Sequence, residues 1–166
     1  MMTENNGETP MKPVFVFATV VVMAVMASGP LLAQSNPFVG TWKLNLAKSK
    51  DTGAFPKEET LSVKMIGDQR QVTVNGTATN GTPILFKYEV PDNGGAGKVL
   101  AGGPYDSVSG KRIDDNTREI SYIKGGKEML HLNSLVSKDG KTMKLTVEGK
   151  DALGKAFSGV AVFEKE

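Results

Sequence analysis

The stretch that decides the fold is Phe38-Val39-Gly40-Thr41-Trp42-Lys43-Leu44, in which Phe38, Trp42 and Leu44 fall on one face and Thr41 and Lys43 on the other. Such alternation is typical of a β-strand with one buried and one solvated face. The same alternation runs through residues 84–90 and 143–148. No long window after residue 33 keeps a helical period, so the sequence predicts an all-β protein.

Turn-forming residues recur along the chain at short, regular intervals. Glycine, asparagine and aspartate pairs recur between the apolar runs, which is typical of antiparallel strands joined by hairpins. We predict ten short strands, over residues 38–46, 59–66, 70–78, 82–90, 97–101, 105–113, 117–124, 127–137, 141–150 and 155–165. The glycine-rich segment 94–103 is expected to have irregular backbone, and its role stays open.

The N-terminal segment has the pattern of a secretory signal. Lys12 precedes a short apolar run over residues 14–26, and small residues follow up to Ala33. We expect cleavage after Ala33, a mature domain over residues 34–166, and a start at either Met1 or Met11. A retained membrane anchor is the alternative, but the run is shorter than the roughly 20 apolar residues that a spanning helix needs.

Composition narrows the class of protein. The 166 residues carry a net charge of +2 with both signs interspersed, and they include no cysteine. This mild charge argues against a nucleic-acid partner. Charged residues on the outward strand positions also argue against an outer-membrane barrel. We therefore expect an exported monomer, periplasmic or secreted, that is not stably inserted in a membrane once the signal is removed.

Both ends of the chain resemble the calycin superfamily, which contains the lipocalins and the fatty-acid-binding proteins. The resemblance rests on residues 38–44, on Lys138-Asp139-Gly140-Lys141 and on the closing Phe163-Glu164-Lys165-Glu166. The opening is also similar to secreted bacterial lipocalin-like proteins that begin Gly-Thr-Trp-Lys-Leu-Asn. The resemblance implies a single antiparallel up-and-down β-barrel without a helical lid, whose first and last strands pair. Gly40, Trp42 and Phe163 would close this barrel.

Two departures from the family bear on the ligand. Lipocalins usually lay an arginine of the last strand over the tryptophan, and here Lys165 is the only substitute within reach. The fatty-acid-binding branch holds a carboxylate with an arginine and a tyrosine of the last strand, but Ala161 and Phe163 stand at those positions. A buried carboxylate without a cation is costly. We therefore expect a neutral apolar ligand, or none.

Residues for familiar catalysis are scarce. His131 is the only histidine, with no acidic neighbour placed to form a triad, and a zinc site needs several histidine or cysteine ligands. The glycines of residues 94–98 lack the spacing of a phosphate-binding loop. We predict no catalytic residue, no metal and no cofactor. The alternative is an enzyme that works through Tyr88, Tyr122 or Arg112, but no motif in the sequence supports it.

The expected function is the binding of a small apolar or amphiphilic molecule inside the barrel. The candidate contacts are aromatic, methionine and aliphatic residues on predicted inward faces: Met65, Val74, Phe86, Tyr88, Tyr122, Met143 and Leu145. The same side chains could instead fill the barrel, which would leave an interaction or structural module of the cell envelope. An internal cavity of roughly 300 Å3 or more would favour ligand binding.

Overall fold

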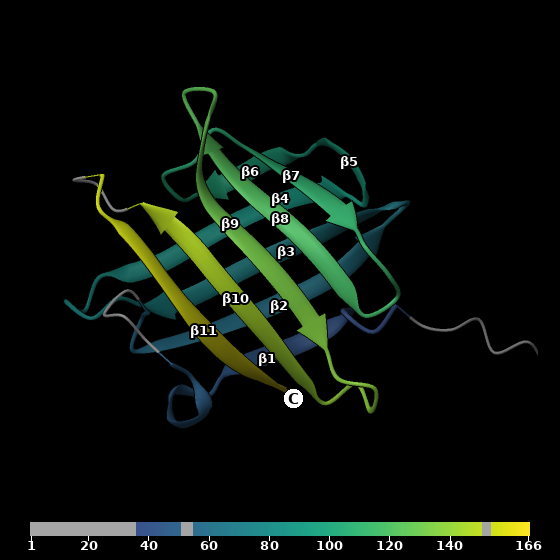
Figure 1. The fold of residues 1–166 in the computed structure, drawn as a ribbon, viewed down its shortest axis with the longest axis horizontal. Helices are drawn as coiled ribbons and strands as arrows, with labels where there is room; N and C mark the ends of the chain where they lie inside the picture. The colour runs from purple at the N-terminus through teal and green to yellow at the C-terminus, as the bar shows by residue number, and fades with distance from the viewer. Residues whose placement is uncertain (1–35, 51–54, 151–153) are drawn as a thin grey trace, which may run out of the picture. The chain divides into compact units, whose positions relative to one another are not determined.

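Antiparallel strands form the whole framework of the protein (Figure 1). The computed structural model describes residues 36–50, 55–150 and 154–166, and the predicted signal at residues 1–33 lies outside them. The elements are β1 (Gly40–Leu44), η1 (Leu46–Lys48), β2 (Glu58–Ile66), β3 (Gln69–Thr77), β4 (Pro83–Pro91), β5 (Asn93–Ala96), β6 (Lys98–Gly102), β7 (Ser107–Arg112), β8 (Thr117–Lys124), β9 (Lys127–Val136), β10 (Thr142–Lys150) and β11 (Ala156–Lys165). They confirm the predicted all-β class.

The first and last strands pair, as predicted. In the antiparallel register of β1 and β11, Trp42 lies opposite Lys165 and Leu44 opposite Phe163. The sheet order is β5-β7-β8-β9-β10-β11-β1-β2-β3-β4-β6, so sequence neighbours pair all the way round except near β5 and β6. This is the up-and-down arrangement that the sequence predicts, with β11 and β1 side by side in Figure 1.

The barrel closes where the chain bends after β4 and meets β7. After β4 the chain passes Asp92 and continues as β5, which pairs with β7, and it then folds back as β6 along β4. The backbone N–H of Arg112 donates to the carbonyl of Asp92 at 2.9 Å, and that of Gly97 donates to the carbonyl of Val108 at 2.6 Å. A Cβ on Gly97 would lie 2.3 Å from the carbonyl oxygen of Glu89. Only glycine therefore fits this crossing.

Most predicted strands agree with the observed ones to within two residues. The exception is β5, because the turn-forming run Asp92-Asn93-Gly94-Gly95 contains the start of a short strand that pairs with β7 at Asn93 and Ala96. The sheet of the described residues thus has eleven strands rather than ten. The register shifts in β5 and β6 match the irregular backbone expected of this glycine-rich segment. None of the helices among the described residues is long and apolar enough to cross a membrane.

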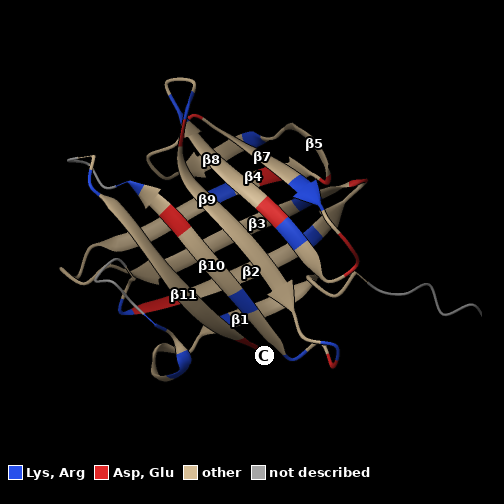
Figure 2. Cartoon of the chain, viewed as in Figure 1, with Lys and Arg blue, Asp and Glu red and all other residues tan. Residues whose placement is uncertain are grey.

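The inward strand faces meet in one apolar core. Along β3, Val72 and Val74 are buried, and along β8, Ile120 and Tyr122 are buried, whereas the residues between them are partly exposed. Charges of both signs are scattered over strands and turns (Figure 2). The barrel therefore has an apolar inside and a mixed, polar outside.

Candidate ligand-binding site

The barrel holds a cavity of about 520 Å3 with a mostly apolar lining. Inward side chains from most of the strands line it, and they include six of the predicted contact residues: Val74, Phe86, Tyr88, Tyr122, Met143 and Leu145. The volume exceeds the size at which ligand binding is favoured over a filled core. The structure thus places these residues round one space, while their contact with a ligand stays a prediction.

Met65 does not belong to this site, and its predicted inward position is wrong. Its side chain is 39% exposed, and its sulfur accepts a hydrogen bond from Asn36 Nδ2 at 3.5 Å. Burial along β2 ends at Val63, because the last residues of the strand extend past the core. Alternation in the sequence continues beyond the point where the barrel stops shielding the strand.

The two ends of the cavity differ in exposure. At the closed end, which we define by Phe38, Trp42, Arg70, Asp92 and Arg118, every side chain except that of Asp92 is 2% exposed or less. At the exposed end, which we define by Glu59, Ile84, Tyr105 and Phe157, the side chains are only partly buried. Glu59 pairs with Gly76 on β3, which on an extended strand is roughly 20 Å from Arg70.

Gly40 and Trp42, two of the residues proposed to close the barrel, lie on β1, and the third, Phe163, lies on β11. The Trp42 side chain is fully buried, and its Nε1–H donates to the carbonyl of Phe38 at 2.8 Å. Lys165 places its Nζ 4.9 Å from the centre of the Trp42 ring, which is a cation–π distance. Gly40 has a φ of 136°, and a Cβ there would meet the Lys165 side chain at 2.6 Å. Phe163, 2% exposed, lines the cavity beside this group.

An aromatic cluster forms one wall of the cavity. Phe86, Tyr88, Tyr105 and Tyr122 pack with ring centres 4.9–5.7 Å apart. The hydroxyls of Tyr88 and Tyr122 share a hydrogen bond of 2.9 Å, and burial raises the pKa of both. Both therefore stay protonated at neutral pH. One hydrogen atom is used between them, so the other remains available to an acceptor on a ligand.

Glu59 brings a carboxyl group to the exposed end of the cavity. Its side chain follows the inward register of Leu61 and Val63 on β2 and lines the cavity. Burial raises the pKa of Glu59 from 4.5 to about 7. The carboxyl therefore changes charge near neutral pH.

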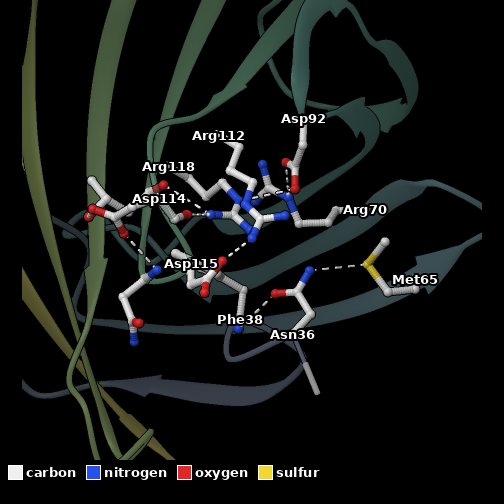
Figure 3. A network of polar contacts seen from close by, with 11 residues as sticks. Asn36, Phe38, Met65, Arg70, Asp92, Arg112, Asp114, Asp115 and Arg118 are labelled. Atoms are coloured by element: carbon white, nitrogen blue, oxygen red, sulfur yellow. Dashed lines mark hydrogen bonds and ion pairs between the residues drawn. The ribbon is translucent and has the colours of Figure 1, made fainter. Parts of the chain in front are cut away.

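At the closed end, two arginines share one carboxylate (Figure 3). Arg70 of β3 donates from Nε to Asp92 Oδ1 at 2.7 Å, and Arg118 of β8 donates from Nε to Asp92 Oδ2 at 3.0 Å. The Phe38 ring lies against both guanidinium groups, with its centre 5.7 Å from that of Arg70 and 4.8 Å from that of Arg118. Both arginine side chains are 2% exposed.

This cluster corrects the expectation that the interior offers no cation. The last strand indeed supplies none, but Arg70 of β3 lines the cavity. Sequence reasoning missed Arg70, Glu59, Tyr105 and Ser134, all of which line the cavity. A signal existed for the two charged residues, because each occupies the inward register of an alternating strand. A charge at such a position is costly unless the fold pairs it or a ligand uses it.

The described residues give little support for a catalytic or metal site. His131 has a side chain that is 35% exposed, and its Nδ1 lies 3.3 Å from the Ser121 hydroxyl and 3.7 Å from Glu128. Arg112 is exposed and pairs with Asp115. Across the described ranges, no group of three metal-ligating side chains comes together. The cavity is therefore the candidate functional site.

Two solved structures are similar to this barrel. One is zebrafish ileal bile acid-binding protein complexed with cholic acid, at 15% identity and a TM-score of 0.49, covering 78% of this chain and 99% of that one. The other is lobster apocrustacyanin A1, at 12% identity and a TM-score of 0.46, covering 80% of this chain and 63% of that one. No protein-family model matches the sequence, and no curated protein matches it. We therefore infer the function from the cavity itself.

Proposed function

We propose that the protein binds a small amphiphilic molecule inside its barrel and performs no catalysis on it. The observation that carries this proposal is the cavity of about 520 Å3, which is within the range of small-molecule sites. Its mostly apolar wall carries a few polar groups, the usual composition of a site that buries an apolar body and orients it by hydrogen bonds.

The side-chain chemistry supports binding rather than reaction. The two inner tyrosines have raised pKa values, which keeps both hydroxyls protonated at neutral pH, so neither is available as a base or a nucleophile. Glu59, whose pKa is raised to about 7, lies opposite Gly76 in the strand register. Gly76 and Arg70 are near opposite ends of β3. Tyr88 and Tyr122 are therefore better suited to hydrogen-bonding a ligand than to attacking it.

We also propose that the protein works outside the cytoplasm, as an exported carrier or scavenger. The support is the signal-like pattern of residues 1–33. The test is fractionation of a host that expresses the full sequence, combined with the N-terminal sequence of the product. Export with cleavage near Ala33 is expected, and an uncleaved product in the cytoplasm would contradict this part of the proposal.

Filling the cavity tests the binding function. Ala161 is 5% exposed and lines the cavity from β11, so Ala161→Phe places a ring in the space. We expect this variant to lose most of the binding of N-phenyl-1-naphthylamine, a neutral apolar fluorescent probe. The matched control is Lys144→Phe, which adds the same ring at an exposed position of the neighbouring strand β10. Equal probe binding by the wild type and Ala161→Phe would show that the interior is not the site.

A further inference from the structure

The two arginines of the closed end differ in how completely they are paired. Arg118 donates to Asp92 and also from Nη1 to the backbone carbonyls of Asp114 and Thr117, the latter at 3.0 Å. Arg70 donates to Asp92 through Nε. Its Nη2 is fully buried and has no hydrogen-bond partner among the described residues. Arg118 is thus held by the fold, whereas Arg70 is only partly satisfied.

The charge of the closed end is also unbalanced. Asp92 is one carboxylate against two guanidinium groups. The other nearby acids, Asp114 and Asp115, are exposed. Asp115 pairs with Arg112, and Asp114 accepts hydrogen bonds from the Asn116 backbone and the Thr117 hydroxyl, while the Arg118 charge also contributes to the lowered pKa of Asp114. Among the buried side chains, positive charge therefore exceeds negative charge, which is costly in the absence of a further anion.

Arg70, the residue with the unsatisfied nitrogen, borders the cavity. Arg70 lines it together with Phe38 and Tyr88, and the remaining lining is mostly apolar. We propose that the ligand carries an anionic oxygen group, such as a carboxylate, and that Arg70 binds this group at the closed end while the apolar body extends towards the exposed end. This inference rests on the proposed function and adds the chemical class and the orientation of the ligand.

Because positive charge is in surplus at the closed end, the stability of an Arg70 variant distinguishes anion binding from a purely structural role of Arg70. If Arg70 only supported the fold, its replacement would leave buried partners unpaired and destabilise the protein. If Arg70 is surplus, Arg70→Met leaves Asp92 paired with Arg118 in a neutral couple. The ligand-free variant should then be at least as stable as the wild type, since an apolar side chain of similar length replaces a poorly satisfied charge.

The experiment compares two ligands that differ only in their head group. Dodecanoate and dodecanol each displace N-phenyl-1-naphthylamine from the purified exported protein, at about pH 8.5, where a carboxylic acid is ionised. We expect the wild type to prefer dodecanoate. Arg70→Met should reduce that preference by roughly ten- to a hundred-fold, the size of one charge-assisted hydrogen bond, while dodecanol binding changes little.

Two further variants separate a local contact from general charge. Arg70→Lys keeps the charge and should retain part of the preference for dodecanoate. Arg112→Met also removes one positive charge, but from an exposed side chain outside the cavity lining, so the preference should not change. As a measurement that needs no variant, dodecanoate should raise the Tm of the wild type more than dodecanol does at equal concentration.

Each outcome decides the question. If both ligands displace the probe but Arg70→Met keeps the preference, or Arg112→Met loses it equally, Arg70 is not the anion subsite and the binding function stands. Failure of Arg70→Met to fold would contradict the surplus charge, and an equal Tm shift with both ligands would contradict anion selection. If neither the probe nor either ligand binds the wild type, the proposed function fails and the subsite with it.

Discussion

The two ends of the barrel are built from different chemistry. The closed end combines a fully buried indole with two buried arginines and one aspartate. The exposed end has partly buried rings and the carboxyl of Glu59, whose pKa burial raises. The comparison teaches that one end buries its aromatic and ionic side chains almost completely, while the other leaves the cavity within reach of a ligand.

This difference follows from the sheet topology. At the closed end, β1, β11 and the crossing of β4 with β7 bring four strands together with Phe38, which precedes β1. At the exposed end, the strands separate into hairpins and connections, so that Tyr105 and Phe157 have fewer neighbours to cover them. Stability should therefore be more sensitive to truncation at the closed end.

The largest effect should come from truncating the indole. Trp42→Ala removes a fully buried ring and its hydrogen bond to Phe38, so we expect the free energy of unfolding to fall by about 4 kcal/mol. Tyr105→Ala, the matched truncation at the exposed end, should cost about 1–2 kcal/mol because its ring is only partly buried. Urea denaturation measures both, and equal losses would remove the contrast between the two ends.

Removing the shared carboxylate should have the next largest effect. Asp92→Asn leaves Arg70 and Arg118 buried without a counter-charge, and we expect a loss of about 3 kcal/mol of unfolding free energy. The comparison variant is Asp115→Asn, which breaks an exposed pair with Arg112 and should cost less than about 1 kcal/mol. A small effect of Asp92→Asn would show that the Asp92 charge does not stabilise the two arginines.

At the exposed end, Glu59 should make the free energy of unfolding depend on pH. The pKa of Glu59 is raised to about 7 in the folded protein, above the unfolded value of 4.5. The folded state therefore binds the proton more tightly, and the contribution of Glu59 to stability falls as the pH rises from about 4.5 to 7. Because the side chain is incompletely shielded, we expect a change of about 2 kcal/mol.

Glu59→Gln tests this assignment, because it removes the titration and keeps the shape of the side chain. The variant should be more stable than the wild type at high pH, and the two should converge in acid. Chemical denaturation across the pH range measures the difference between the two proteins, which cancels the titration of the other acids. A difference that does not change with pH would contradict the raised pKa of Glu59.

Much of the framework could be predicted from the sequence, because strand alternation and turn residues are local. The pairing of β1 with β11 was predicted through the resemblance of the chain's two ends. β5 was not predicted, since Asn93-Gly94-Gly95 has strong turn chemistry and extends only because β7 offers it a partner. Likewise, Met65 continues the alternation of β2 but lies beyond the shielding of the core.

The site could be predicted only in part, for a physical reason. Its apolar lining follows from the inward register of the strands, and Phe86, Tyr88 and Tyr122 were found in that way. The ionic cluster depends on the meeting of Arg70, Asp92 and Arg118. That meeting arises where the chain bends after β4 and crosses β7, a tertiary feature without a local sequence pattern.

The smallest effect concerns the lysine over the indole. Lys165→Met keeps an apolar stem near Trp42 but removes the charge 4.9 Å from the ring centre and the hydrogen bond to the Pro37 carbonyl at 3.3 Å. We expect a loss of about 0.5–1 kcal/mol, the range of an exposed cation–π contact. Lys165→Arg should restore it, because a guanidinium stacks on aromatic rings at least as well as an ammonium. Urea denaturation of the three proteins decides the point. If both variants match the wild type, the Lys165 charge contributes nothing, and the closed end is held by packing and by the Asp92 cluster alone.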